Sequence, residues 1–125
     1  MCKVILMLLL GIVSNSAMAA WTQLVQNGTD TVYADISTIS KTGNNVKMWD
    51  LLSMKKNTGD NYLSLRSLQE FDCKEHKNRI ISYSTYSGNM GNGNMVKSSN
   101  RVHEWLPVRS GGVTEKLWNT ACGKK

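Results

Sequence analysis

Histidine and cysteine are scarce in this chain of 125 residues, which contains 2 histidines and 3 cysteines. Neither C-x-x-C nor H-x-x-x-H spacing occurs, whereas a structural zinc site needs four such ligands at recognisable spacings. The sequence therefore predicts no metal site, and it predicts no cofactor. Internal repeats, low-complexity tails and linkers are also missing, so we expect one small domain.

Groupings of catalytic residues are absent as well. No acid and base flank a nucleophile, and the glycines of "SGNMGNG" do not precede a helix in a strand–helix–strand unit, as a phosphate-binding loop requires. Met90 and Met95 lie beside these glycines without a third soft ligand nearby, so we expect loop packing and not copper binding. The sequence predicts a protein that is not an enzyme.

Long apolar runs are limited to the N-terminus. "MCKVILMLLLGIVSNSAMA" places Lys3 before an apolar run of about ten residues and small residues after it, which is the layout of a cleavable secretory signal. That run is too short for a membrane-spanning helix, which needs about 20 residues. We expect residues 1–19 to be removed and residues 20–125 to be exported to the periplasm, the cell surface or the medium. Cys2 precedes the apolar run, so no lipid anchor is predicted.

Two cysteines, Cys73 and Cys122, remain after removal of the signal. Because small exported domains are commonly stapled by disulfides, a Cys73–Cys122 bridge is the simplest interpretation. Two alternatives stay open. The C-x-x-H spacing of Cys73 and His76 suits half of a metal site, and a catalytic Cys–His pair would require a free thiol.

Alternation and turn signals predict a domain rich in β-strands. "WTQLVQ" and "TVYADI" flank the turn signal "NGTD", which predicts an N-terminal hairpin. Further strands are expected in "NNVKMWDLLSMKK", "YLSLRSLQEFDC", "RIISYSTYS" and "MVKSS". Asp and Ser in "DISTIS" favour a turn or a helical cap, and the glycine and asparagine of "GNMGNGN" predict a flexible loop.

The C-terminal segment "GGVTEKLWNTACGKK" changes to a helical period. One apolar stripe along this helix is formed by Val113, Leu117, Trp118, Ala121 and Cys122. Gly112 is expected at the N-cap and Gly123 just beyond the C-terminal end. The chain is therefore predicted to be α+β, with the disulfide joining the helix to the end of a strand and with the ring of His76 in solvent.

Basic residues outnumber acidic ones, 15 to 9, which gives a formal net charge of +6 at pH 7. Lys74, Lys77 and Arg79 are crowded into one predicted turn, and Lys55 and Lys56 end a predicted strand. Such cations steer a protein toward anionic partners, so we predict these five as ligand-binding residues for an extracellular-matrix protein or an anionic polysaccharide. The alternative is a solvated turn that aids solubility. Because we expect the protein to be exported, we do not expect it to bind nucleic acid.

Four segments carry a resemblance to a known family: "VYADISTI", "VKMWDLLSMKK", "YLSLRSLQEFDCKEHKNRIISYSTYSGNMGNG" and "EKLWNTACGKK". They are similar to the surface-adhesin protein E family of exported bacterial proteins, most specifically in EFDCK, YSGNMG and LW-x-x-ACG. The resemblance implies an antiparallel sheet of about six strands with the C-terminal helix packed on it. It also implies a binding role without enzymatic activity, since the named example of the family binds host extracellular-matrix proteins.

Two classes of function follow from the sequence. The first is an exported binding module that recognises a protein or a polyanion. The second is a soluble periplasmic protein that maintains or builds the envelope and has no host ligand. Location at the surface or in the periplasm distinguishes the two.

Overall fold

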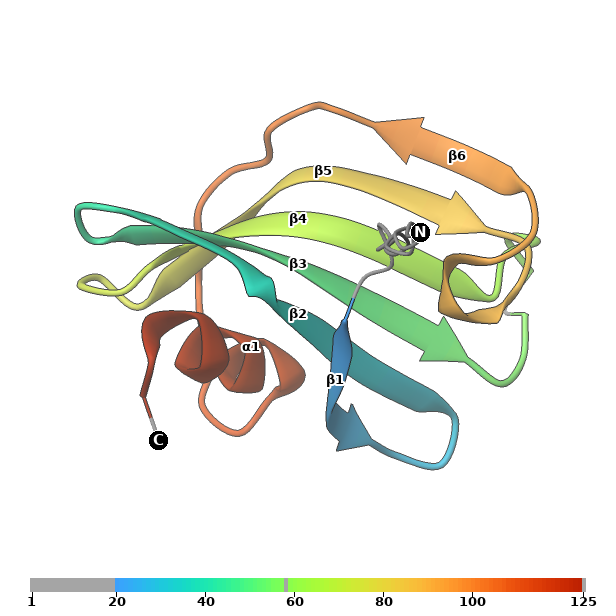
Figure 1. Ribbon diagram of the computed structural model, residues 1–125, viewed down its shortest axis with the longest axis horizontal. Helices are drawn as coiled ribbons and strands as arrows, with labels where there is room; N and C mark the ends of the chain where they lie inside the picture. The colour runs from blue at the N-terminus through green and yellow to red at the C-terminus, as the bar shows by residue number, and fades with distance from the viewer. Residues whose placement is uncertain (1–19, 58, 125) are drawn as a thin grey trace, which may run out of the picture.

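The computed structural model describes residues 20–57 and 59–124, so the predicted signal peptide lies outside the described residues. One antiparallel sheet carries a C-terminal helix on one of its faces (Figure 1). The elements are β1 (Trp21–Gln26), β2 (Asp30–Thr42), β3 (Asn45–Met54), β4 (Ser64–Asp72), β5 (Lys77–Tyr86), the 3-10 turn η2 (Asn89–Gly91), β6 (Met95–Ser99), β7 (Leu106–Pro107) and α1 (Val113–Cys122).

The strands are hydrogen-bonded in chain order from β1 to β6, and each neighbouring pair is antiparallel. The short β7 pairs with the first two residues of β5. The predicted antiparallel sheet of about six strands with a C-terminal helix is confirmed. The seventh strand has only two residues, too few for an alternating pattern to be recognised in the sequence.

The core lies between α1 and the face of the sheet that it covers. Phe71 and Met48 are completely buried there, and β3 and β4 place Val46 directly opposite Phe71. From the helix, Leu117, Trp118 and Ala121 complete the core, as the predicted apolar stripe requires. Gly112 and Gly123 stand at the two caps, and Gly123 adopts the left-handed conformation that favours glycine.

The segment "DISTIS" is part of β2 and does not end the strand, so the predicted turn or helical cap is wrong. The local tendency of Asp and Ser nevertheless appears as a break in the pairing with β3 between Asp35 and Ser40. There the carboxylate of Asp35 accepts hydrogen bonds from the backbone and hydroxyl of Ser37. Trp49 N donates to the hydroxyl of Thr38 at 3.0 Å, so a side chain replaces the missing backbone partner.

The glycine–asparagine loop is fixed by hydrogen bonds to β3 and β4, in contrast to the flexible loop predicted from its composition. Asn89 Nδ2 donates to Ser53 Oγ at 2.9 Å and to the carbonyl of Met54 at 2.6 Å. The buried hydroxyl of Ser64 donates to the carbonyl of Gly88 and accepts from the backbone of Gly91. These bonds hold the loop where β6 begins.

Replacing Ser64 with alanine should lower the free energy of unfolding by about 1–3 kcal/mol, because the partly buried carbonyl of Gly88 and N–H of Gly91 lose their shared partner. Urea denaturation of the variant measures this loss. Ser98→Ala is the matched control, since Ser98 is exposed on β6 and its replacement should change stability by less than about 0.5 kcal/mol. Equal stability of Ser64→Ala and Ser98→Ala would contradict the anchoring role.

Candidate functional site

One end of the sheet gathers three segments that are distant in the sequence. The register pairs Thr42 with Asn45, Asn45 with Asp72, and Asp72 with Lys77, so the β2–β3 turn and the β4–β5 turn lie side by side. A disulfide joins Cys73 in the second turn to Cys122 at the end of α1, with their Cα atoms 5.7 Å apart. The C-terminus of the helix is therefore held at this same end.

Two further contacts attach the β4–β5 turn to the helix. The indole N–H of Trp118 donates to the carbonyl of Asp72 at 3.0 Å. The ring of His76 packs edge-on against Trp118, with their centroids 4.2 Å apart. The prediction of a His76 ring in solvent is therefore wrong, because the indole of Trp118 offers it an apolar surface.

The five predicted binding residues do not form one cluster. Lys74 is exposed in the turn and lines a hollow of about 390 Å³ beside the disulfide. Lys77 and Arg79 belong to β5 and not to the turn. Lys55 and Lys56 follow β3 at its other end, about 30 Å away along a strand of ten residues. In an antiparallel sheet, successive turns lie at opposite ends. Lys55 and Lys56, which follow β3, are therefore at the end opposite to Lys74, Lys77 and Arg79.

Arg79 is bound within the sheet and is not a free cation. Its Nη2 and Nε atoms contact Glu70 Oε1 at 2.8 and 2.9 Å, and its guanidinium lies 4.4 Å from the centre of the Trp105 ring. Two charge-assisted contacts to one carboxylate oxygen orient both side chains. Arg79 therefore links β4 to β5 through Glu70, and its charge is already paired within the sheet.

The structure adds cations that the sequence analysis did not select. Lys41 from the end of β2 and Lys124 from beyond α1 line the same hollow as Lys74. We call this end of the sheet the basic end and define it by its exposed lysines: Lys41, Lys47, Lys74, Lys77 and Lys124. Their spacing in the sequence gives no signal, because four separate segments supply them.

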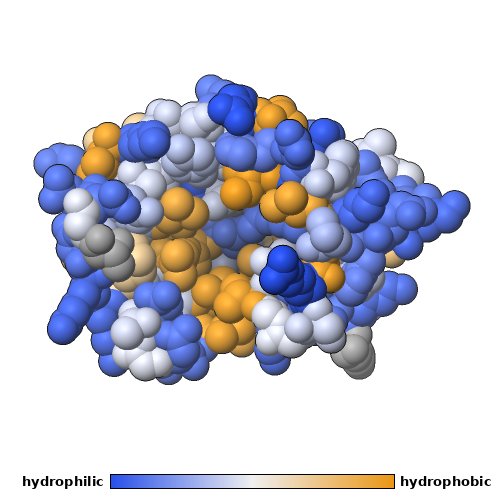
Figure 2. All heavy atoms as spheres, turned by 180° about the vertical axis from the view of Figure 1, so that it is seen from behind, coloured by the Kyte–Doolittle hydropathy of each residue, from blue (hydrophilic) through white to orange (hydrophobic). Residues whose placement is uncertain are grey.

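A second surface, the helix-face groove, lies on the part of the covered face that α1 leaves open. Figure 2 shows this face hollowed near its middle, with hydrophobic side chains around the hollow and hydrophilic ones at its floor. The central hollow, of about 340 Å³, lies between α1 and strands β2 to β5. Its lining includes Val32, Leu52, Leu65, Ile80, Val113 and Leu117.

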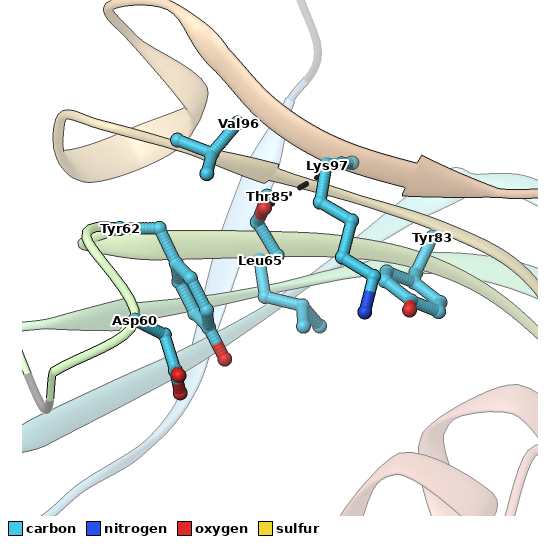
Figure 3. Close-up of a pocket in the computed structure, with 7 residues that line it drawn as sticks. All are labelled: Asp60, Tyr62, Leu65, Tyr83, Thr85, Val96 and Lys97. Atoms are coloured by element: carbon cyan, nitrogen blue, oxygen red, sulfur yellow. Dashed lines mark hydrogen bonds between the residues drawn. The ribbon is translucent and has the colours of Figure 1, made fainter.

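The groove continues in both directions from this centre. Leu65 lines both the central hollow and a second hollow, of about 340 Å³, beside β6. Ile80 lines both the central hollow and a third hollow, of about 470 Å³, beside β7. In Figure 3, Asp60 and Tyr62 line one side of the β6 hollow and Lys97 and Tyr83 the other.

A buried carboxyl group lies at the floor of the groove. Asp50 is only 4% exposed, and its Oδ2 accepts a hydrogen bond from Gln69 Nε2 at 2.8 Å. Gln69 Oε1 in turn accepts from Asn78 Nδ2 at 2.8 Å, so a polar chain crosses three strands. Burial raises the pKa of Asp50 from 3.8 to about 7, although hydrogen bonds from Gln69 and Ser67 act in the opposite direction. In the sequence, Asp50 could have been noticed as an acid that falls on the same strand face as the apolar Val46 and Met48.

The family profile of surface-adhesin protein E matches residues 21–123, nearly all of the described chain. The chain belongs to the surface-adhesin protein E family. The resemblance of its four sequence segments is thereby confirmed. No curated protein sequence is similar enough to count as a match.

Solved structures of Haemophilus influenzae protein E share the fold of this member of the surface-adhesin protein E family. Crystal form II superposes with a TM-score of 0.66 at 14% identity, covering 86% of this chain and 91% of the other. The selenomethionine form gives 0.64 at 13% identity, with coverage of 86% and 89%. At such low identity the similarity establishes the architecture, and residue roles must come from this chain.

Two negative findings apply to the described part of this family member. Over residues 20–57 and 59–124, no three His, Cys, Asp or Glu side chains are grouped as metal ligands would be. In the same ranges no helix has both the length and the apolar character of a membrane span.

Proposed function

We propose that this protein is an exported, non-enzymatic adhesin that attaches to an anionic macromolecule through the basic end. The partner is an acidic extracellular-matrix protein or a sulfated polysaccharide. The observation that carries the proposal is the gathering of exposed lysines from four chain segments at one end of the sheet. Membership in the surface-adhesin family supports it.

The arrangement of the lysines suits a repeating polyanion better than a single small anion. Each exposed lysine contributes little alone, because water and salt screen its charge within about 8 Å at physiological ionic strength. Several lysines on one rigid end can contact successive anionic groups together, which increases the total binding energy. The disulfide and the Trp118 contacts hold these segments in place before the partner arrives.

Reversing the charges of Lys41 and Lys74 together should weaken binding to immobilised heparin at least tenfold at 0.15 M salt. Both side chains are exposed, so the variant should keep its fold. Surface plasmon resonance over a salt series measures the effect, and binding of the wild type should fall as salt increases. An acidic matrix protein is the second immobilised partner.

The matched control reverses Lys55 and Lys56, which changes the net charge equally at the opposite end of the sheet. This variant should lose no more than about threefold in affinity, the part due to net charge alone. Equal losses for the two variants would show that position is unimportant and would remove the basic end from the site. Absence of binding by the wild type to both partners would favour the periplasmic envelope role.

A further inference from the structure

The helix-face groove has the length and form of a site for an extended chain. Its three hollows follow β5 from Asn78, beside β7, to Thr85, beside β6. Seven residue steps of about 3.3 Å give a length of about 23 Å, which an extended peptide of about seven residues would fill.

The lining of the groove alternates between apolar and polar groups. Leu65 and Ile80 lie on the same strands as Ser67, Gln69 and Thr85, and all five contribute to its surface. An acyl chain would leave these polar groups facing hydrocarbon, which is unfavourable when they cannot exchange water for another partner. A peptide offers both apolar side chains and backbone hydrogen-bonding groups, so it matches this alternation.

The charged residues that line the groove indicate which kind of side chain the middle of the peptide should carry. The central hollow is lined by two acidic residues, Asp30 and Asp50, whereas its lining contains no lysine or arginine. Two cations, Lys97 and Arg109, line only the hollows at the two ends. A basic side chain would therefore be favoured at the centre of the groove.

We propose that the helix-face groove binds an extended peptide of about seven residues that has apolar side chains and one central basic side chain, which Asp50 receives. Asp50 is buried with only neutral hydrogen-bond partners, the amide of Gln69 and the hydroxyl of Ser67, and the lining of the central hollow contains no cation. A lysine or arginine of the peptide would supply the opposite charge that a buried carboxylate requires.

This site is separate from the basic end in both place and charge. The basic end attracts anions, while the centre of the groove favours a cation, so one ligand group cannot serve both. The peptide inference therefore does not rest on the proposed adhesive function. Reversal of Lys41 and Lys74 should leave peptide binding unchanged.

The test begins with selection of random heptapeptides, displayed on phage, against the purified exported protein. The selected peptides should carry a central lysine or arginine with apolar neighbours. For a synthetic peptide of the selected sequence, Asp50→Asn should lower the affinity about tenfold in fluorescence anisotropy. A peptide with methionine in place of its basic residue should bind the wild type and Asp50→Asn equally.

A second variant tests the groove independently of Asp50. Val113, which lines both the central hollow and the one beside β7, is 38% exposed, so Val113→Trp should fill the groove and lower the affinity at least tenfold. Val102→Trp is the control, because Val102 is 50% exposed and lies outside the three hollows.

Three results would overturn the inference. One is a selection that yields no saturable heptapeptide binder, and another is a binder that Val113→Trp and Asp50→Asn leave unaffected. The third is palmitate binding that Val113→Trp abolishes while no peptide binds, which would make an acyl chain the occupant. Near-ultraviolet circular dichroism of each variant confirms that a loss of affinity is not a loss of fold.

Discussion

Replacing Cys73 and Cys122 together with serine should lower the free energy of unfolding by about 4 kcal/mol. The two residues are separated by 49 positions, and the chain-entropy estimate for closing a loop of that length has this size. For one small domain this is a large part of a net stability that is typically about 5–15 kcal/mol. Urea denaturation of the oxidised wild type and the double variant measures the difference.

The disulfide should also stabilise the packing of α1 on the sheet, because it attaches the end of this helix to the β4–β5 turn. A helix of ten residues such as α1 is only marginally stable alone, so packing and the bridge must hold it on the sheet. We therefore expect the double variant to expose Trp118 to solvent, visible as a red shift of tryptophan fluorescence at a temperature where the wild type remains folded.

The bridge itself can be checked in the exported protein. Its mass should be two hydrogens below that of the reduced protein, and no thiol should react with an alkylating reagent unless reductant is added. Free thiols on Cys73 and Cys122 in the native protein would contradict the disulfide. They would favour the alternative in which Cys73 and His76 form half of a metal site.

The stability of the wild type relative to Asp50→Asn should fall by about 4 kcal/mol as the pH rises from below 4 to above 7. Burial raises the pKa of Asp50 from 3.8 to about 7, so the folded protein binds the proton more tightly than the unfolded chain. The stabilisation due to this proton is complete below pH 3.8 and is lost as the pH rises to about 7. The magnitude follows from about three pKa units at 1.36 kcal/mol each.

The comparison with Asp50→Asn removes the contributions of other carboxylates, which titrate alike in both proteins. Asparagine is nearly isosteric and can still accept the hydrogen bond from Gln69, so the variant should remain folded. Urea denaturation of both proteins at pH 4, 5.5, 7 and 8 gives the two pH profiles. Parallel profiles would show that Asp50 keeps an ordinary pKa in the folded state.

A carboxyl group that destabilises the fold at neutral pH calls for an explanation. An apolar residue at position 50 would avoid the cost, and the neighbouring Val46 and Met48 on the same strand face are apolar. Residues in clefts whose pKa is strongly shifted are concentrated at functional sites. The unfavourable ionisation of Asp50 thus agrees with a groove that receives a cation.

Local features of the sequence were sufficient for most of the secondary structure. The four-residue recurrence of Val113, Leu117 and Ala121 predicted α1, and its glycine caps were correct. Alternation predicted the long strands because successive side chains of a strand face opposite sides. The predictions for "DISTIS" and "GNMGNGN" were wrong because their preferred local conformations were altered by partners on β3 and β4.

What the sequence alone determined is most of the six longer strands, the helix and two cysteines able to pair, since each depends on residues a few positions apart or on composition. Tertiary structure decided which charges share a surface. It brought Lys41 and Lys124 to Lys74, turned Arg79 toward Glu70, and left Lys55 and Lys56 at the far end. It also placed Asp50 at the floor of a groove. These arrangements depend on strand register and on where α1 packs, and both are set by the burial of the whole apolar face.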